Sequence, residues 1–253
     1  SIVIVGDISP KEAEIKVNQY LGRWSSGDIQ TSEVPTPNKR TSRDVYIIDK
    51  PGAPQSVIIM GNLGIKRNDP DYLATYVMNT ALGSQFTSRL NMNLREDKGY
   101  TYGTGSFFSS RKGVGPFGCY APVQTKYTKE AIKEMIKELT DITKSRPLSN
   151  QEVENTKRNL INKFPRKFEG LSAISDEASD LVMYNLPEFD WQLYMEKVNS
   201  ITGEMATQAA KDHIHPDNLL IVVVGDRDAI ENDIKSLNLG DIYFLDQNGE
   251  PIN

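Results

Sequence analysis

The order of apolar and polar positions predicts a chain that begins with strands and continues mainly as helices. Apolar runs bounded by Gly, Pro or Asp predict strands at 1–5, 45–49, 56–61 and 219–224, and a hairpin of 100–109 with 116–123. Helical spacing predicts helices at 10–24, from 69 to 83, at 129–144, 149–166, 171–184, 190–198, 202–212 and 228–237. A further helix carries Phe86, Leu90 and Leu94 on one stripe. This order indicates an α+β fold, a mixed β-sheet with helices packed on one face.

Capping signals predict where two of these helices begin. Asp69 stands directly before Pro70, as an N-cap residue stands before a proline in the first turn. Ser149 is followed three residues later by Glu152, which is the spacing of a capping box. We therefore expect one helix to start at Asp69–Pro70 and another at Ser149.

The two ends of the chain repeat one pattern, in which an apolar strand runs into Gly-Asp and an amphipathic helix. The copies are centred on Gly6-Asp7 and Gly225-Asp226. Each apolar run suits a buried central strand, and the Asp can cap the helix. We expect 1–24 to be the last strand and helix of an upstream homologous domain, 25–43 to be a linker, and 44–253 to be the C-terminal domain. A nucleotide-binding turn would start similarly, but the glycines of a phosphate-binding loop are missing.

Composition narrows the range of partners. The chain has 253 residues and a net charge of -5, which disfavours nucleic acid because phosphate binding requires a basic face. No apolar run approaches the roughly 20 residues of a transmembrane helix. The single cysteine, Cys119, cannot form an internal disulfide, and we expect it in the core.

The only two histidines, His213 and His215, are two residues apart. In an extended segment they could share a face and bind a metal, or they could cap the polar mouth of a strand. No HExxH or HxxEH helix accompanies them, and no Cys is near. We therefore predict no metal site in this chain.

The run from Leu94 to Gly103 places the cation of Arg95 and the phenol of Tyr102 on the two sides of a turn at Gly99. Arg95 at a helix end and Tyr102 at a strand start could be directed at one point, where together they would hold a carbonyl that gains negative charge. The plain alternatives are a cation that satisfies the last carbonyls of a helix and an aromatic that packs across a sheet. Neither side chain is a strong base or nucleophile, so the pair would stabilise rather than attack.

The runs 82–90 and 94–103 resemble the C-terminal half-site of the pitrilysin/insulinase zinc peptidases, the inverted zincins that include the mitochondrial processing peptidases and bacterial members. The repeated ends, the segment 51–55 and the helix start near Leu148 extend the resemblance over most of 1–237. It implies duplicated α/β domains around a chamber, a mostly antiparallel sheet in each, and an arginine followed seven positions later by a tyrosine. By this resemblance Tyr102 would hydrogen-bond the oxyanion, and Arg95 would hold a substrate carbonyl beside the cleaved bond.

The family also implies a zinc helix with the motif HxxEH, which this sequence lacks. We therefore expect no cofactor in this piece, zinc supplied by an upstream domain or a partner subunit, and an inactive domain when it is isolated. The expected partners are a peptide substrate and that zinc-binding unit. Ser84 and Tyr100 depart from the glycine and leucine common in the family. A non-catalytic scaffold subunit and a peptide-binding module that uses a sheet edge are alternatives. The compartment stays open between a bacterial periplasm and cytoplasm.

Overall fold

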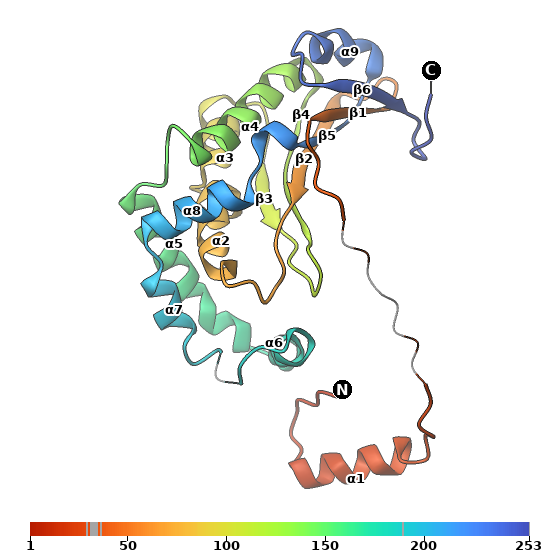
Figure 1. The fold of residues 1–253 in the computed structure, drawn as a ribbon, viewed down its shortest axis with the longest axis vertical. Coiled ribbons are helices and arrows are strands. Elements are labelled where there is room, and N and C mark those ends of the chain that lie inside the picture. The colour runs from red at the N-terminus through yellow and green to blue at the C-terminus, as the bar shows by residue number, and fades with distance from the viewer. Residues whose placement is uncertain (29, 31–34, 36, 189, 253) are drawn as a thin grey trace.

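The structure is a computed structural model that describes residues 1–28, 30, 35, 37–188 and 190–252. Its centre is a mixed sheet with the strand order β3-β4-β2-β5-β1-β6 (Figure 1). The strands are β1 (Asp44–Asp49), β2 (Gln55–Leu63), β3 (Gly105–Phe108), β4 (Pro116–Gln124), β5 (Leu220–Gly225) and β6 (Asp241–Leu245). β2 pairs antiparallel with β4 and β5, and β3 with β4, whereas β1 pairs parallel with β5 and β6. The prediction of a mixed, mostly antiparallel sheet in an α+β fold is confirmed.

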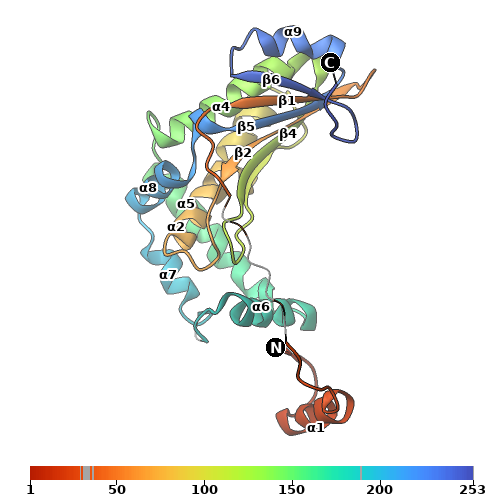
Figure 2. The same cartoon turned by 45° about the vertical axis from the view of Figure 1, so that its right-hand side comes forward.

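Helices cover one face of this sheet, whereas α1 lies apart from it (Figure 2). The helices are α1 (Pro10–Leu21), α2 (Tyr72–Asn79), α3 (Arg89–Asn91), α4 (Thr128–Thr143), α5 (Asn150–Lys163), α6 (Leu171–Tyr184), α7 (Tyr194–Ser200), α8 (Gly203–His213) and α9 (Arg227–Lys235). Two π-helical segments continue α2 and α3, at Thr80–Ser84 and Met92–Asp97, and short 3-10 turns span Thr125–Tyr127, Phe164–Phe168 and Pro216–Asn218. Among the described residues, no helix is long and apolar enough to span a membrane.

Side chains alternate along the strands between a buried and an accessible face. In β2, Ile58 and Met60 are fully buried, whereas Val57 and Ile59 remain 39% and 44% exposed. Successive residues of a strand point to opposite faces, so the buried set faces the helices. Cys119 of β4 lies in this core as predicted, and burial raises the pKa of its thiol. The core is thus one layer between sheet and helices, and the other face of the sheet stays open.

Several helix starts differ from the prediction. α2 begins two residues after Pro70, because the Asp69 carboxylate accepts the N–H of Asp71 in a turn before the helix. Phe86 does not belong to the predicted stripe: the backbone is extended at Gln85, and Ser88 is the N-cap of a new helix. The capping box at Ser149 is confirmed.

The two ends of the chain also differ from the prediction. Residues 1–5 do not form the expected strand, since a strand needs a hydrogen-bonded neighbour and the described structure gives them none. α1 follows, capped by Ser9 rather than Asp7, and buries none of its residues. β5 is central as predicted, but only alternate residues are buried. β6 was not predicted. Residues 29, 31–34 and 36 of the expected linker lie outside the described part of the chain.

Candidate active site

Arg95 is carried by the π-helical segment that continues α3. Leu94 of this segment and Leu90 of α3 are fully buried and fix one side of the helix in the core. Arg95, the next residue, emerges with 38% of its side chain exposed. Its Nε lies 3.4 Å from a carboxylate oxygen of Glu96, and its guanidinium carbon lies 4.9 Å from the centre of the Phe86 ring. The cation is therefore at the surface with an aromatic face beside it.

A hydrogen-bonded turn joins this segment to the residues that follow. Gly99 has φ +65°, the left-handed conformation that glycine adopts without strain, and ends the helix. The N–H of Tyr100 then donates to the carbonyl of Leu94 at 2.9 Å. The Tyr100 ring stacks on Tyr127 with 4.7 Å between the ring centres. The departure from leucine at position 100 therefore supplies an aromatic contact that holds the turn.

Tyr102 lies at the tip of a braced loop and is 88% exposed. The Thr101 hydroxyl accepts from the N–H of Gly103 at 3.1 Å and donates to its carbonyl at 2.9 Å. The hydroxyl of Thr104 donates to the carbonyl of Tyr120 at 2.6 Å, which fastens the loop to β4. β3 begins only at Gly105, so the prediction that Tyr102 lies in a strand is wrong. Threonine hydroxyls compete here for the backbone groups that would otherwise extend the hairpin.

The two predicted residues, Arg95 and Tyr102, are both accessible. They are seven positions apart, and the turn at Gly99 lies between them. Among the described residues, no hydrogen bond or ion pair joins Arg95 to Tyr102 directly. The phenol is free to donate a hydrogen bond, and the guanidinium offers several donors. An electron-rich oxygen is the partner that suits both.

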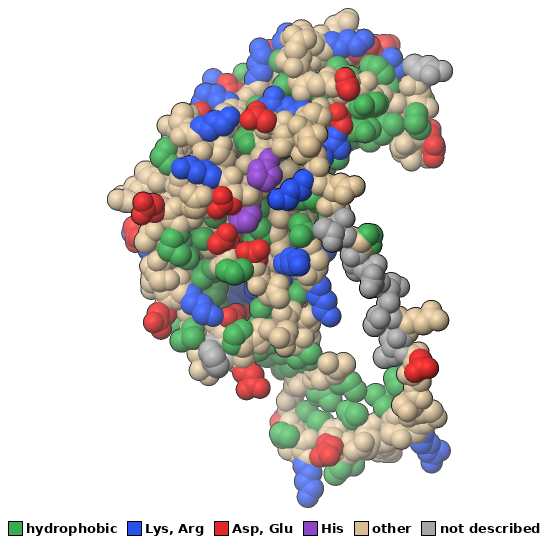
Figure 3. Space-filling view, viewed as in Figure 1, with side chains coloured by type: hydrophobic (Ala, Val, Ile, Leu, Met, Phe, Trp, Pro, Cys, Tyr) green, Lys and Arg blue, Asp and Glu red, His purple; other side chains and the backbone are tan. Residues whose placement is uncertain are grey.

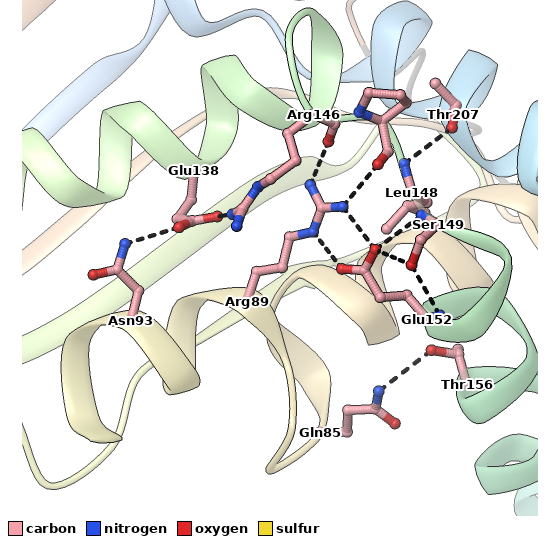
Figure 4. Close-up of polar contacts among 11 residues, drawn as sticks. Gln85, Arg89, Asn93, Glu138, Arg146, Leu148, Ser149, Glu152, Thr156 and Thr207 are labelled. Carbon is pink, nitrogen blue, oxygen red and sulfur yellow. Dashed lines mark hydrogen bonds and ion pairs between the residues drawn. The ribbon is translucent and has the colours of Figure 1, made fainter. Parts of the chain in front are cut away.

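Arg89 anchors the segment that carries Arg95 to helix α5 (Figure 4). Its Nε and Nη2 donate to the two carboxylate oxygens of Glu152 at 2.6 and 2.9 Å. The same guanidinium donates to the carbonyls of Arg146 and Pro147 at 2.5 and 2.9 Å. The side chain is only 6% exposed. Such a two-pronged arginine–carboxylate pair fixes orientation as well as distance.

The Glu152 carboxylate serves two elements at once. It accepts from the N–H and hydroxyl of Ser149 in the capping box and from Arg89. Burial alone would raise the pKa of Glu152, but the hydrogen bonds from Arg89 and Ser149 outweigh it and hold the pKa at about 2. The carboxylate therefore stays charged at neutral pH. No local sequence pattern predicted the contact of Arg89 with Glu152, because the two residues are 63 positions apart.

A second polar contact ties the π-helical segment to α4. The Asn93 amide donates to Glu134 and Glu138 at 2.9 and 2.8 Å. Glu138 is buried and pairs with Arg146, whose carbonyl also binds Arg89 (Figure 4). The segment before Arg95 is thus held on two sides by carboxylates, of which that of Glu138 is buried and that of Glu152 is half-buried.

The turn at Gly83 and Ser84 packs directly against β3. A Cβ at position 83 would lie 2.4 Å from the backbone nitrogen of Ser106, so only glycine fits this approach. The Ser84 hydroxyl donates to the carbonyl of Ser106 at 2.7 Å and accepts from the Asn79 amide at 2.7 Å. The departure at Ser84 therefore adds a link between the π-helical segment Thr80–Ser84, α2 and β3.

The histidines do not form the zinc centre that the resemblance implies for another domain. His213 is the last residue of α8. Its Nε2 lies 3.1 Å from the Oδ2 of Asp71, and the two side chains form an ion pair only with a protonated imidazole. The backbone N–H of His215 donates to Asn62, and burial lowers the pKa of its imidazole. Ligand atoms of Asp69, Asp71 and His213 lie within 4.8 Å of one another, and of the three residues Asp71 is exposed while Asp69 and His213 are half-buried. Figure 3 shows the histidines among acidic and basic side chains. This cluster links α2 to α8 and lacks the two helix-borne histidines of HxxEH.

Comparisons with known proteins indicate the family of this chain. The family model described as the peptidase M16 inactive domain matches residues 1–160. An uncharacterised zinc protease of Streptomyces coelicolor is 33% identical over 101 residues, which is 39% of this chain and 22% of that protein. An uncharacterised zinc protease of Bacillus subtilis, YmxG, is 27% identical over 162 residues, covering 63% and 37%.

The fold agrees with these matches. The crystal structure of a peptidase M16 inactive domain from Pseudomonas fluorescens superposes with a TM-score of 0.79 at 25% identity, covering 87% of this chain and 52% of that one. Fold and matches together define a domain of the zinc-peptidase type that lacks its own zinc helix. The chain belongs to the peptidase M16 inactive domain family, which confirms the resemblance to the pitrilysin/insulinase peptidases. It spans about half of the solved chain and less of the two zinc proteases.

Proposed function

We propose that residues 44–253 form the domain that holds substrate and stabilises the transition state in a zinc-dependent endopeptidase. The observation that carries this proposal is the exposed pair Arg95 and Tyr102 on a braced helix–turn–loop unit. Buried bonds hold the base of this unit, while its two functional groups remain accessible. That arrangement suits side chains that must keep their positions as charge develops on a substrate.

The two groups have different roles in the proposal. The Tyr102 hydroxyl donates a hydrogen bond to the oxygen of the scissile carbonyl as that oxygen becomes negative. It can do so because a phenol stays protonated at neutral pH. Arg95 holds a neighbouring carbonyl of the peptide through its guanidinium, with the Phe86 ring limiting its movement. The Tyr102 hydrogen bond strengthens as negative charge grows on the scissile oxygen, which lowers the barrier. The Arg95 contact instead keeps the peptide in the reactive position.

The remaining parts of the enzyme lie in other units. We propose that an upstream domain or a partner subunit supplies the zinc and its water, and that residues 1–24 are the end of such an upstream domain. The exposed apolar side chains of this segment support that assignment, since Ile2 and Trp24 are 58% and 79% exposed. Residues 25–43 then act as the linker between two domains of one type.

The test uses the complete protein that contains this chain. Tyr102→Phe removes one donor and is expected to lower turnover of a fluorogenic peptide about 10²- to 10³-fold. Its melting temperature should be unchanged, because the side chain is 88% exposed. Tyr243→Phe, at a half-exposed tyrosine of β6, is the matched control and should keep full activity.

Two outcomes would contradict the proposal. Unchanged hydrolysis by Tyr102→Phe would remove the catalytic role of the phenol. A complete, zinc-loaded protein that hydrolyses no peptide from a diverse library would instead favour the scaffold subunit.

A further inference from the structure

A groove of about 480 Å³ lies between helix α5 and the turn that precedes α3. Gln85 and Thr87 form one wall, and the side chains of α5 and the following turn form the other. The Gln85 amide donates to the Thr156 hydroxyl of α5 at 3.3 Å (Figure 4) and accepts from the Asn159 amide at 3.0 Å. The two walls are therefore held together by hydrogen bonds.

The charged side chains that line this groove are Arg158, Lys163 and Arg166, with no carboxylate among them. All three are exposed. Within the described part of the chain no ion pair involves them, whereas the neighbouring Lys157 and Arg89 are paired with glutamates. The chain as a whole carries a net charge of -5, so this groove is a local exception. A groove of unpaired cations favours an anionic occupant.

The other lining groups indicate what kind of anion would fit. Asn155 and Asn162 present carboxamides, which offer donors and acceptors together. A peptide backbone carries both kinds of group, whereas a bare phosphate offers acceptors only. Nucleic acid would also need a longer basic face than three cations on an acidic chain. The chemistry therefore favours a peptide that bears carboxylates.

One wall of the groove adjoins the proposed active site along the chain. Its wall residues Gln85 and Thr87 flank Phe86, whose ring lies against the Arg95 guanidinium. Phe86 therefore contacts Arg95, while its two neighbours in the chain line the groove. We propose that the groove binds an acidic segment of the substrate, flanking the cleaved bond; this inference rests on the proposed function.

Binding of two labelled peptides to the complete protein tests the proposal. The peptides have the same length and cleavage region and differ only in three Glu or three Gln on one flank. Fluorescence anisotropy should give a dissociation constant about tenfold lower for the Glu peptide, and 0.5 M salt should reduce this preference. The triple variant Arg158→Gln, Lys163→Gln, Arg166→Gln should bind both peptides equally.

A matched variant separates the groove from net charge. Lys112→Gln, Lys133→Gln and Lys211→Gln remove the same three charges from exposed sites elsewhere, and this variant should keep the preference. Equal binding of both peptides by the unmodified protein, or equal losses in the two triple variants, would overturn the proposal. Displacement of the Glu peptide by an oligonucleotide of equal charge would also overturn it, in favour of a general polyanion site.

Failure of this inference can be told from failure of the proposed function. Binding does not require hydrolysis, so a preference for the Glu peptide that persists while Tyr102→Phe hydrolyses normally would contradict only the catalytic role. Loss of turnover in Tyr102→Phe without any charge preference would contradict only the groove.

Discussion

The guanidinium carbon of Arg95 lies 4.9 Å from the centre of the Phe86 ring, although the two residues belong to separate backbone segments. Phe86 is 59% exposed, so this contact contributes little to the core. An exposed cation–π contact is worth about 0.5–1 kcal/mol. Its effect here is to restrict the positions that the Arg95 side chain can take.

Replacing Phe86 tests this restriction. Phe86→Leu keeps an apolar side chain but removes the ring, and is expected to lower kcat/KM for peptide hydrolysis about two- to fivefold. Phe86→Tyr keeps the ring and should retain activity. The free energy of unfolding should change by less than about 0.5 kcal/mol in both variants. Identical kinetics of all three proteins would show that the ring does not position Arg95.

Loss of Arg89 should destabilise the domain. Arg89→Met leaves the Glu152 carboxylate without its main partner and two carbonyls without donors, and we expect a loss of about 3 kcal/mol in the free energy of unfolding. Arg89→Lys should recover only part of it, since an ammonium cannot reproduce the two-pronged contact. Arg158→Met, at an exposed position of α5, is the control for loss of one cation. Urea denaturation of the three variants measures these differences.

Acid should weaken the same contact. The pKa of Glu152 is held at about 2, below its ordinary value of 4.5. The folded protein binds this proton less readily than the unfolded chain, so the stabilisation is complete above about pH 4.5 and is lost as the pH falls toward 2. Because the side chain is 34% exposed, we expect about 1–2 kcal/mol rather than the full conversion of the shift.

The comparison of Glu152→Gln with the unmodified protein isolates this effect. The difference between their urea midpoints should be largest at pH 6, clearly smaller at pH 3, and should shrink further toward pH 2. A difference that does not change with pH would show that the charge of Glu152 adds nothing to stability.

Gly83 should tolerate no side chain. In Gly83→Ala the new Cβ would lie 2.4 Å from the nitrogen and hydroxyl oxygen of Ser106, so backbone must move. We expect a loss of about 1–3 kcal/mol, as for other overpacked cores. Gly103→Ala is the control, because no atom lies within 4 Å of its Cβ position. Equal melting temperatures of the two variants would contradict the close approach of the π-helical segment Thr80–Ser84 to β3.

The sequence predicted those elements whose signals are local. Helix α6 was predicted with its observed bounds, and α4 within one residue of each end, because their apolar spacing and flanking residues agree. β6 was missed: its five residues follow a helix and a turn, and only pairing with β1 makes them a strand. An edge strand of this kind forms only by pairing with a strand that is distant in the sequence, so its own residues do not predict it.

Arg95 and Tyr102 were named as candidate site residues from the sequence, but the backbone conformation around them was not predicted. The spacing of Arg95 and Tyr102 was visible in the sequence, and their accessibility agrees with the proposed role. The loop around Tyr102 was taken for a strand, since Tyr, Thr and Phe favour strands on average. The π-helical turns were not predictable either, because they depend on contacts such as those of Asn93 with α4. The Arg89–Glu152 contact joins residues too far apart to carry a joint signal.

The shared carboxylate of Glu152 has a consequence for exchanging parts between related proteins. The Glu152 carboxylate caps the N-terminus of α5 and also binds Arg89, next to the segment that carries Arg95. A transplanted α5 therefore brings Glu152 into a protein whose arginine partner comes from the other parent. A chimera should therefore keep its orientation of Arg95 only when both segments come from the same parent.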